Sequence, residues 1–200
     1  MSAKARKFLA KDVILRKVIQ KNGTLRLSKR KDYFNILILS IANQQLSGKA
    51  AMTIYGRLKK LCKGRITPER ISRLDSRQIR KAGFSRMKIS FMKDLSKKFL
   101  DGHVSPHKFH VQSDQDVLEE LVKIRGIGRW TAEMFLIFSL GREDVFPADD
   151  LGIKKSIARL YGVKDISQKN LDKFAERWKP YRSYASLYLW KSMDTSQDGW

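Results

Sequence analysis

A four-residue turn with two glycines, Arg125-Gly126-Ile127-Gly128, constrains this chain more than any other stretch. Apolar side chains recur at helical spacing on both sides of it, at Leu118, Leu121, Val122, Ile124, Ala132, Phe135, Leu136 and Phe138. Glycines permit a tight turn and let another backbone approach closely. The pattern predicts two helices joined by a hairpin. A plain helix–helix connector is the commoner origin of a short glycine turn, so spacing alone does not assign it a function.

The second helix of this hairpin is predicted to begin with backbone N–H groups and the positive end of a helix dipole, which together can hold an anion. Composition indicates which class of anion. The 200 residues include 42 Lys and Arg against 20 Asp and Glu, so the formal net charge is +22. Such an excess predicts a polyanionic partner. Because structural RNA-binding proteins share this trait, charge alone does not distinguish DNA from RNA.

The hydrophobic content of 42% is enough for a core, and the length suits one compact domain or two lobes. A single cysteine, Cys62, excludes an intramolecular disulfide and any iron–sulfur cluster ligated by cysteines of this chain. Cys62 itself is expected to be a buried apolar residue. No apolar run has transmembrane length and no signal peptide is visible, so we expect an intracellular protein without a membrane partner.

The remaining apolar spacing is helical throughout, and no strand pattern or internal repeat is present. A mobile basic lead is expected over residues 1–8. Helices are predicted over residues 8–19, 33–42, 48–62, 86–100, 151–160, 168–178 and 181–193, with short ones after Pro68 and Asp75. Expected capping residues are Ser47, Asp75, Ser113 with Asp116, and Ser167. Most of the C-terminal aromatic residues are expected in the core, namely Trp178, Tyr181, Tyr184, Tyr188 and Trp190.

Three histidines, His103, His107 and His110, lie close together in a loop-like stretch. Their spacing suits a metal only if the segment is helical, and Pro106 disfavours a continuous helix there. No further ligand is placed to complete a tetrahedral set. We therefore expect no metal at this cluster, and any other role for it stays open.

The stretch LVKIRGIGRWTAEMF, followed by VFPADDLGI, resembles the helix-hairpin-helix DNA glycosylases that have a Gly/Pro-rich loop and then an Asp. Within this HhH-GPD superfamily it is most similar to the 3-methyladenine DNA glycosylase II branch. The resemblance runs from about Lys11 to Trp190, without the large N-terminal β-rich domain of some bacterial members. It implies an all-α, two-lobed fold with the active-site cleft between the lobes. One lobe is expected over about residues 35–140, and the other over about residues 1–34 plus 141–200.

The resemblance implies one catalytic carboxylate, Asp150, which directly precedes Leu-Gly. Its neighbour Asp149 is then expected to cap a helix or brace the loop. Taken alone, an Asp-Asp pair before a helix is more often a cap, so the Phe-Pro-Ala context decides in favour of Asp150.

DNA contacts are implied at two elements that match the family. The Gln-Gln-Leu-Ser element is expected to face the minor groove. Gln45 is the expected side chain that fills the gap left by the target nucleotide, and Leu46 is the alternative. Without the resemblance, these amides would be expected only to cap or bridge helix ends. The implied contact residues are Gln44, Gln45, Leu46, Ser47, Arg125, Gly126, Ile127, Gly128, Arg129, Thr131 and, from a turn similar to the family's Gly-Phe-Ser element, Lys88.

The implied base pocket comprises Trp130, Trp190 and Tyr188. An aromatic pocket selects a base that carries positive charge by stacking and cation–π attraction. Two positions depart from the bacterial pattern, because Met134 and Leu151 stand where Tyr is usual, so the pocket is less aromatic.

The residue at position 130, Trp130, also indicates which type of reaction to expect. Relatives that cut the DNA backbone carry Lys there as a Schiff-base nucleophile. We therefore expect a monofunctional hydrolase that uses water and has no lyase activity.

No cofactor is expected for this chemistry. By resemblance, a structural Na⁺ or K⁺ is expected on the backbone carbonyls of Ile124 and Ile127. The expected partner is double-stranded DNA containing alkylated bases, bound by a monomer.

The sequence thus predicts a DNA N-glycosylase of base excision repair that removes 3-methyladenine and 7-methylguanine and leaves an abasic site. Two alternatives remain open: a non-catalytic helix-hairpin-helix DNA-binding module, and a glycosylase for another lesion.

Overall fold

The computed structural model describes residues 1–193, and all regular elements in that range are helical. The predicted all-α class is therefore confirmed. The chain forms two compact units. Unit 1 combines Met1–Lys29 with the segment from Leu136 onward, and unit 2 is Arg30–Phe135. The lobe assignment and the cleft expected from the resemblance stay predictions.

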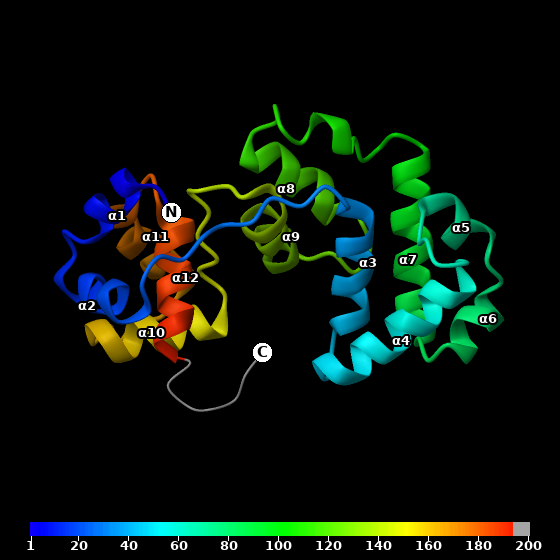
Figure 1. Cartoon of the computed structure of the whole chain (residues 1–200), viewed down its shortest axis with the longest axis horizontal. Helices are drawn as coiled ribbons and strands as arrows, with labels where there is room; N and C mark the ends of the chain where they lie inside the picture. The colour runs from blue at the N-terminus through cyan, green and yellow to red at the C-terminus, as the bar shows by residue number, and fades with distance from the viewer. Residues whose placement is uncertain (194–200) are drawn as a thin grey trace. The chain divides into compact units, whose positions relative to one another are not determined.

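Unit 2 is built around α7 (Arg86–Leu100), which contacts α3 (Tyr33–Asn43), α5 (Pro68–Arg73) and α6 (Ser76–Lys81). In Figure 1, α7 lies between α3 on one side and the α5–α6 pair on the other. The other elements of unit 2 are α4 (Gly48–Leu61), η1 (Pro106–Lys108), α8 (Asp114–Val122) and α9 (Arg129–Phe135). Rings of Tyr33, Phe109 and Phe135 meet edge to face with centroids 5.5 Å apart, which joins α3 to α9.

Local capping explains where the helices of unit 2 begin. Ser47 accepts a hydrogen bond from Ala50 N at the start of α4. Reciprocal capping boxes begin α6 at Asp75 and α8 at Ser113. These caps were predicted from sequence, and they satisfy backbone donors that a helix leaves without partners in its first turn.

Unit 1 surrounds α12 (Arg182–Met193), which contacts α2 (Val13–Asn22), α10 (Leu151–Tyr161) and η3 (Glu176–Trp178). The remaining elements are α1 (Ala3–Leu9), the π-helical turn η2 (Leu136–Leu140) and α11 (Gln168–Ala175). Most of the C-terminal aromatics lie in this core, as predicted: Trp178, Tyr181, Tyr184 and Tyr188 are at most 8% exposed.

The N-terminal prediction was wrong. Residues expected to form a mobile lead and one helix over 8–19 instead form α1 and α2, separated at Asp12. The Asp12 carboxylate caps α2 through Ile14 N and Leu15 N, and also accepts from the Tyr161 hydroxyl and Trp178 Nε1, both at 3.0 Å. Burial of Ala5 and Leu9 holds α1 against the core. The break between α1 and α2 is thus fixed by hydrogen bonds from Tyr161 and Trp178, which are far from Asp12 in sequence.

Ser167 occupies the predicted N-cap position of α11, but its side chain makes no capping bond. Its backbone N–H instead donates to Asp165 Oδ1 at 2.9 Å. The helix predicted to reach Trp178 ends at Ala175 and continues as the 3-10 turn η3. Among residues 1–193, no helix combines the length and apolar character that a membrane span requires.

Candidate active site and nucleic-acid interface

The glycine hairpin joins α8 to α9 in unit 2, as the apolar spacing predicted. Ile127 N donates to the Ile124 carbonyl at 3.0 Å, which closes the turn. Outside it, Asp94 of α7 accepts a hydrogen bond from Arg125 N at 2.8 Å. The hairpin is therefore tied to the long central helix of its unit through its main chain.

The two hairpin glycines differ in what surrounds them. Gly126 has φ +82°, and a Cβ there would lie 2.1 Å from Phe91 Cδ2. Gly128 has no heavy atom within 4 Å of the position that a Cβ would take. Gly126 is thus required by packing against Phe91, whereas the space beside Gly128 is open to another molecule.

The Gln-Gln-Leu-Ser element lies against this hairpin. Gln44 Nε2 donates to the Gly126 carbonyl at 2.7 Å. Gln45 follows with φ +56°, and its side chain is exposed. Leu46 is 42% exposed. Gln44 therefore bridges the two elements, and both candidates for the gap-filling side chain project from a strained turn beside the hairpin.

The turn before α7 adjoins the same element. A pocket of about 440 Å³ is lined by Gln44, Gln45, Leu46, Gly83, Ser85, Met87 and Lys88. Lys88 was expected to contact a phosphate, but it is 7% exposed and its Nζ donates to the Ala42 carbonyl at 2.8 Å. Burial lowers the pKa of this amine. Lys88 therefore holds the C-terminal end of α3, and we do not keep it as a DNA-contact residue.

Asp150 begins α10 in unit 1. It is the N-cap residue, and its Oδ1 accepts from Ile153 N at 2.9 Å. Asp149 was expected to cap this helix or brace the loop. It does not cap the helix, but its ion pair with Lys154 Nζ at 2.9 Å is consistent with a brace between the loop and α10. The cap is Asp150, so one side chain both caps the helix and occupies the position matched to the family's catalytic Asp.

Trp190 of α12 orients the same carboxylate. Its Nε1 donates to Asp150 Oδ1 at 2.8 Å, and its half-buried ring packs against Phe138 with centroids 5.6 Å apart. Gly152 makes room for this contact: a Cβ there would lie 3.1 Å from both Asp150 Oδ1 and Trp190 Cδ1. The glycine after Asp150 is therefore part of the site, which sequence reasoning did not recognise.

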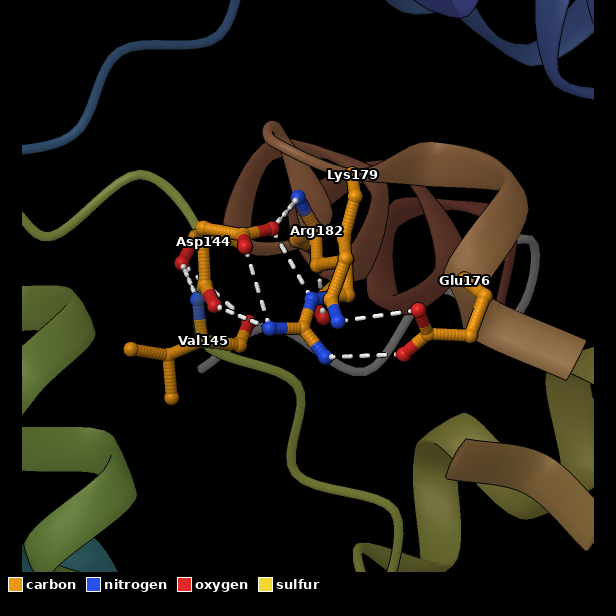
Figure 2. A network of polar contacts seen from close by, with 7 residues as sticks. Asp144, Val145, Glu176, Lys179 and Arg182 are labelled. Atoms are coloured by element: carbon orange, nitrogen blue, oxygen red, sulfur yellow. Dashed lines mark hydrogen bonds and ion pairs between the residues drawn. The ribbon is translucent and has the colours of Figure 1, made fainter. Parts of the chain in front are cut away.

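An ion-pair network anchors the loop that carries Asp150. Arg182, at the start of α12, donates from Nε to Asp144 Oδ1 at 2.8 Å and from Nη2 to Asp144 Oδ2 at 3.0 Å. It also donates from Nη2 to the Asp144 carbonyl at 2.9 Å (Figure 2). Glu176 adds an ion pair with Lys179 at 2.8 Å. Two parallel hydrogen bonds fix both the distance and the relative orientation of the Arg182 guanidinium and the Asp144 carboxylate. The loop is therefore held in a defined position against α12.

Two further residues extend this attachment. The buried Ser183 hydroxyl accepts from Val145 N at 2.9 Å and donates to the Val145 carbonyl at 3.1 Å. The Tyr184 hydroxyl donates to Glu143 Oε1 at 3.2 Å. Burial and the Glu143 carboxylate raise the pKa of Tyr184 to about 12. Sequence reasoning missed these contacts because their partners lie about forty residues apart.

Comparison with known proteins assigns this chain to a family. The model of the HhH-GPD superfamily base excision DNA repair proteins matches residues 38–180. The chain belongs to the HhH-GPD superfamily. In this HhH-GPD protein, the matched range contains the Gln-Gln element, the hairpin and Asp150, and it ends before Trp190.

Its relatives confirm the expected branch. DNA-3-methyladenine glycosylase 1 of Schizosaccharomyces pombe is 40% identical over 172 residues, which are 84% of this chain and 75% of that protein. The structure of a DNA-3-methyladenine glycosidase from Bacillus halodurans has a TM-score of 0.89 at 36% identity, covering 97% of this chain and 90% of that one. The structure of Schizosaccharomyces pombe Mag1 in complex with abasic DNA has a TM-score of 0.84 at 34% identity, covering 99% and 100%.

The three aromatic residues predicted for the base pocket differ in exposure and in the unit to which they belong. Tyr188 is fully buried, and its hydroxyl donates to the Gly23 carbonyl at 2.8 Å, so it belongs to the core of unit 1. Trp130 is 50% exposed on α9 of unit 2. Leu151, one of the two departures from the family pattern, is 62% exposed. Within residues 1–193, the structure shows Trp190 in contact with the candidate catalytic carboxylate of its own unit.

Among the other predicted contact residues of the hairpin, Arg125 and Gly128 are exposed, whereas Ile127 is 2% exposed, so only its main chain remains a candidate for DNA contact. Arg129 is exposed and forms an ion pair with Glu133 at 2.8 Å, and Thr131 is half-buried. His103, His107 and His110 are all exposed. Within residues 1–193, no group of three or more His, Cys, Asp or Glu side chains is arranged to hold a metal ion.

Proposed function

We propose that this protein is a monofunctional DNA N-glycosylase that hydrolyses the N-glycosidic bond of alkylated purines, 3-methyladenine and 7-methylguanine, and leaves an abasic site. The observation that carries the proposal is the Asp150 carboxylate, oriented by Trp190 Nε1 and Ile153 N at the first turn of α10. The names of the relatives support the substrate class. A DNA substrate also implies that the protein acts inside the cell.

The chemistry begins with access to the base. A target base inside a duplex must be rotated out, which costs roughly a few kcal/mol. Gln45, with Leu46 as the alternative, fills the space that the nucleotide leaves. The main chain around Gly126 and Gly128 holds the DNA backbone, with Thr131 as an added donor.

Bond cleavage then develops positive charge on the sugar. The C–N bond breaks, the base leaves with the bonding electrons, and water oxygen bonds to C1′ and loses a proton. A carboxylate about 4 Å from a full positive charge contributes roughly 4 kcal/mol at an effective dielectric of 20. Asp150 supplies that stabilisation or activates the water, and its fixed orientation means that little reorganisation is needed as charge develops.

Base selection follows from the charge on the lesion. Alkylation at purine N3 or N7 makes the base cationic and weakens its bond to the sugar. An aromatic face attracts such a base by about 1–2 kcal/mol. Trp190 offers one half-buried ring whose N–H is already committed to Asp150, so stacking and carboxylate orientation depend on the same side chain. We retain Trp130 as a second contact residue.

Trp130 stands where lyase-active relatives have Lys, so no Schiff base forms there. The carbonyls of Ile124 and Ile127 remain our candidates for a structural Na⁺ or K⁺, which would stiffen the hairpin without entering the reaction.

A panel of single-lesion duplexes tests the proposal. Incubation with the protein, followed by alkali, is expected to reveal abasic sites at 3-methyladenine first and 7-methylguanine second. Strand breaks before alkali would indicate a lyase. The absence of product on every lesion would indicate a binding module.

Asp150→Asn is the matched catalytic control, because an amide oxygen can still accept from Ile153 N and Trp190 Nε1. We expect excision to fall about 10³-fold, as the estimated 4 kcal/mol implies, with unchanged affinity for damaged duplex. Full activity of this variant would remove Asp150 from the mechanism.

A further inference from the structure

A cationic groove lies on unit 2 between α6 and α7. Its volume is about 640 Å³. The five charged side chains that line this α6–α7 groove are all cationic: Arg77, Arg80, Lys81, Arg86 and Lys93. The uncharged lining consists of serines and Ile89, so no acidic residue lines the groove. Asp75, the N-cap of α6, acts electrostatically on Lys93 without lining the groove.

Two of these cations are committed to the fold. Lys93 Nζ donates to the carbonyls of Ile71, Ser72 and Leu74 at 2.6–2.8 Å, which closes the C-terminal end of α5. Burial lowers the pKa of this amine. Arg80 Nη1 donates to the Phe84 carbonyl at 2.9 Å.

The other three cations have no such role. Arg77, Lys81 and Arg86 are exposed. Within residues 1–193, the structure records no side-chain hydrogen bond or ion pair for any of them. Three like charges around one groove repel each other, and packing does not require them there. Their placement is therefore explained by an anionic partner better than by stability.

The groove and the pocket beside the Gln-Gln element are lined in part by neighbouring residues of the chain. The turn between α6 and α7 separates them: Ser85 lines the pocket that also contains Gln44 and Gln45, and Arg86, the next residue, lines the groove. In Figure 1, this turn connects the end of α6 to the start of α7. Arg86 is thus the next residue in sequence after one that lines the Gln-Gln pocket.

We propose that the α6–α7 groove binds the phosphodiester backbone of duplex DNA through Arg77, Lys81 and Arg86, as a sequence-independent contact additional to the glycine hairpin. The groove takes over the role that sequence reasoning gave to Lys88. This inference rests on the DNA substrate of the proposed function, but it assigns the groove no part in bond cleavage.

Salt dependence measures such contacts directly. Each cation that neutralises a phosphate of duplex DNA contributes about 0.9 to the slope of log affinity against log salt concentration. The triple variant Arg77→Gln/Lys81→Gln/Arg86→Gln should therefore lower the slope for undamaged duplex by about 2.7. Substitutions at exposed positions such as these usually change stability little, so we expect the triple variant to fold. If it does not fold, the three single variants replace it, and each should lower the slope by about 0.9.

Two matched controls separate the groove from net charge. The triple variant Lys164→Gln/Lys169→Gln/Lys173→Gln removes the same charge from exposed positions in or next to α11 of unit 1. Lys88→Met removes a buried cation next to the groove. We expect both to retain the wild-type slope. Equal slopes in the groove variant and the α11 variant would overturn the proposal.

The experiment also distinguishes this inference from the proposed function. At saturating enzyme, single-turnover excision by the groove variant should equal wild type, because no reacting group is altered. In one outcome, the wild type excises no lesion while the groove variant, unlike the α11 variant, shows a smaller slope of log affinity against log salt concentration. That result would contradict the proposed activity but support DNA binding by the groove. If poly-glutamate binding is weakened by the groove substitutions while DNA affinity is not, the groove serves an acidic protein and our inference is wrong.

Discussion

The glycine hairpin and the Asp150 loop are held by different kinds of contact. The hairpin is attached through its main chain, with Arg125 N bound to Asp94 and the Gly126 carbonyl bound to Gln44. The Asp150 loop is attached through its carboxylate side chains, with Asp144 bound to Arg182 and Asp150 bound to Trp190, in addition to main-chain bonds at Glu143 and Val145.

This difference follows from what each region presents. A hairpin that holds a phosphate with backbone N–H groups works best without side chains, so its glycines matter for the space they leave. A loop that supports cleavage presents one carboxylate whose direction must be set. Hairpin substitutions should therefore change folding or DNA affinity, and substitutions around Asp150 should change turnover.

The largest effect on stability should come from Gly126→Ala. Its Cβ would overlap the Phe91 ring, and the residue would be held at positive φ, so unit 2 should lose about 3 kcal/mol of stability. Urea unfolding checks this. Gly128→Ala is the matched control, because its Cβ meets no atom of the described protein. It should fold normally but bind duplex about 10-fold more weakly, through loss of one charge-assisted contact. Equal stability of the two variants would contradict the assignment.

Arg182→Met should lower the single-turnover excision rate by about 10- to 100-fold, because the Asp150 loop loses its forked anchor to α12. DNA affinity should change less than twofold. Arg182→Lys retains the charge without the fork and should recover part of the rate. Both variants should be measured well below their melting temperatures. A loss of affinity with an unchanged rate would show that Arg182 is not a positioning residue.

Gly152→Ala should reduce excision about 10-fold. The added methyl group would lie 3.1 Å from Asp150 Oδ1 and Trp190 Cδ1, so these side chains should shift by a few tenths of an ångström, and we expect their hydrogen bond to weaken. Alanine suits a helix better than glycine by about 0.8 kcal/mol, so the melting temperature should not fall by more than a few degrees. Trp190→Phe tests the same bond by removing its donor. If both variants excise at the wild-type rate, the Trp190 contact does not orient Asp150.

The smallest effect concerns pH. The pKa of Tyr184 is raised to about 12, so the native state keeps this proton above the ordinary tyrosine pKa of about 10. The resulting stability is complete below pH of about 10 and is lost as pH rises through about 12. Between pH of about 10 and about 12, the Tyr184→Phe variant should therefore lose less free energy of unfolding than the wild type, by on the order of 1 kcal/mol. Parallel curves for wild type and variant would argue against the Glu143 interaction.

Local sequence patterns predicted most of the helices and their caps, but they did not predict the role of every residue in them. Helical spacing and caps such as Ser47 and Ser113 were read correctly, because their partners lie within four residues. Lys88 was misassigned because its partner, the Ala42 carbonyl, lies forty-six residues away. Tyr188 was placed in the base pocket by its family position, whereas its hydrogen-bond partner, the Gly23 carbonyl, lies 165 residues away in sequence.

The sequence by itself determined the helical class, the hairpin, the family and the identity of the candidate carboxylate, since each depends on residues adjacent along the chain. The tertiary structure alone decided that Gly126 packs on Phe91, that Trp190 and Gly152 set the direction of Asp150, and that Arg86 rather than Lys88 is exposed. The physical reason is that burial and hydrogen-bond partners come from segments far apart in sequence, and spacing within one segment carries no information about them.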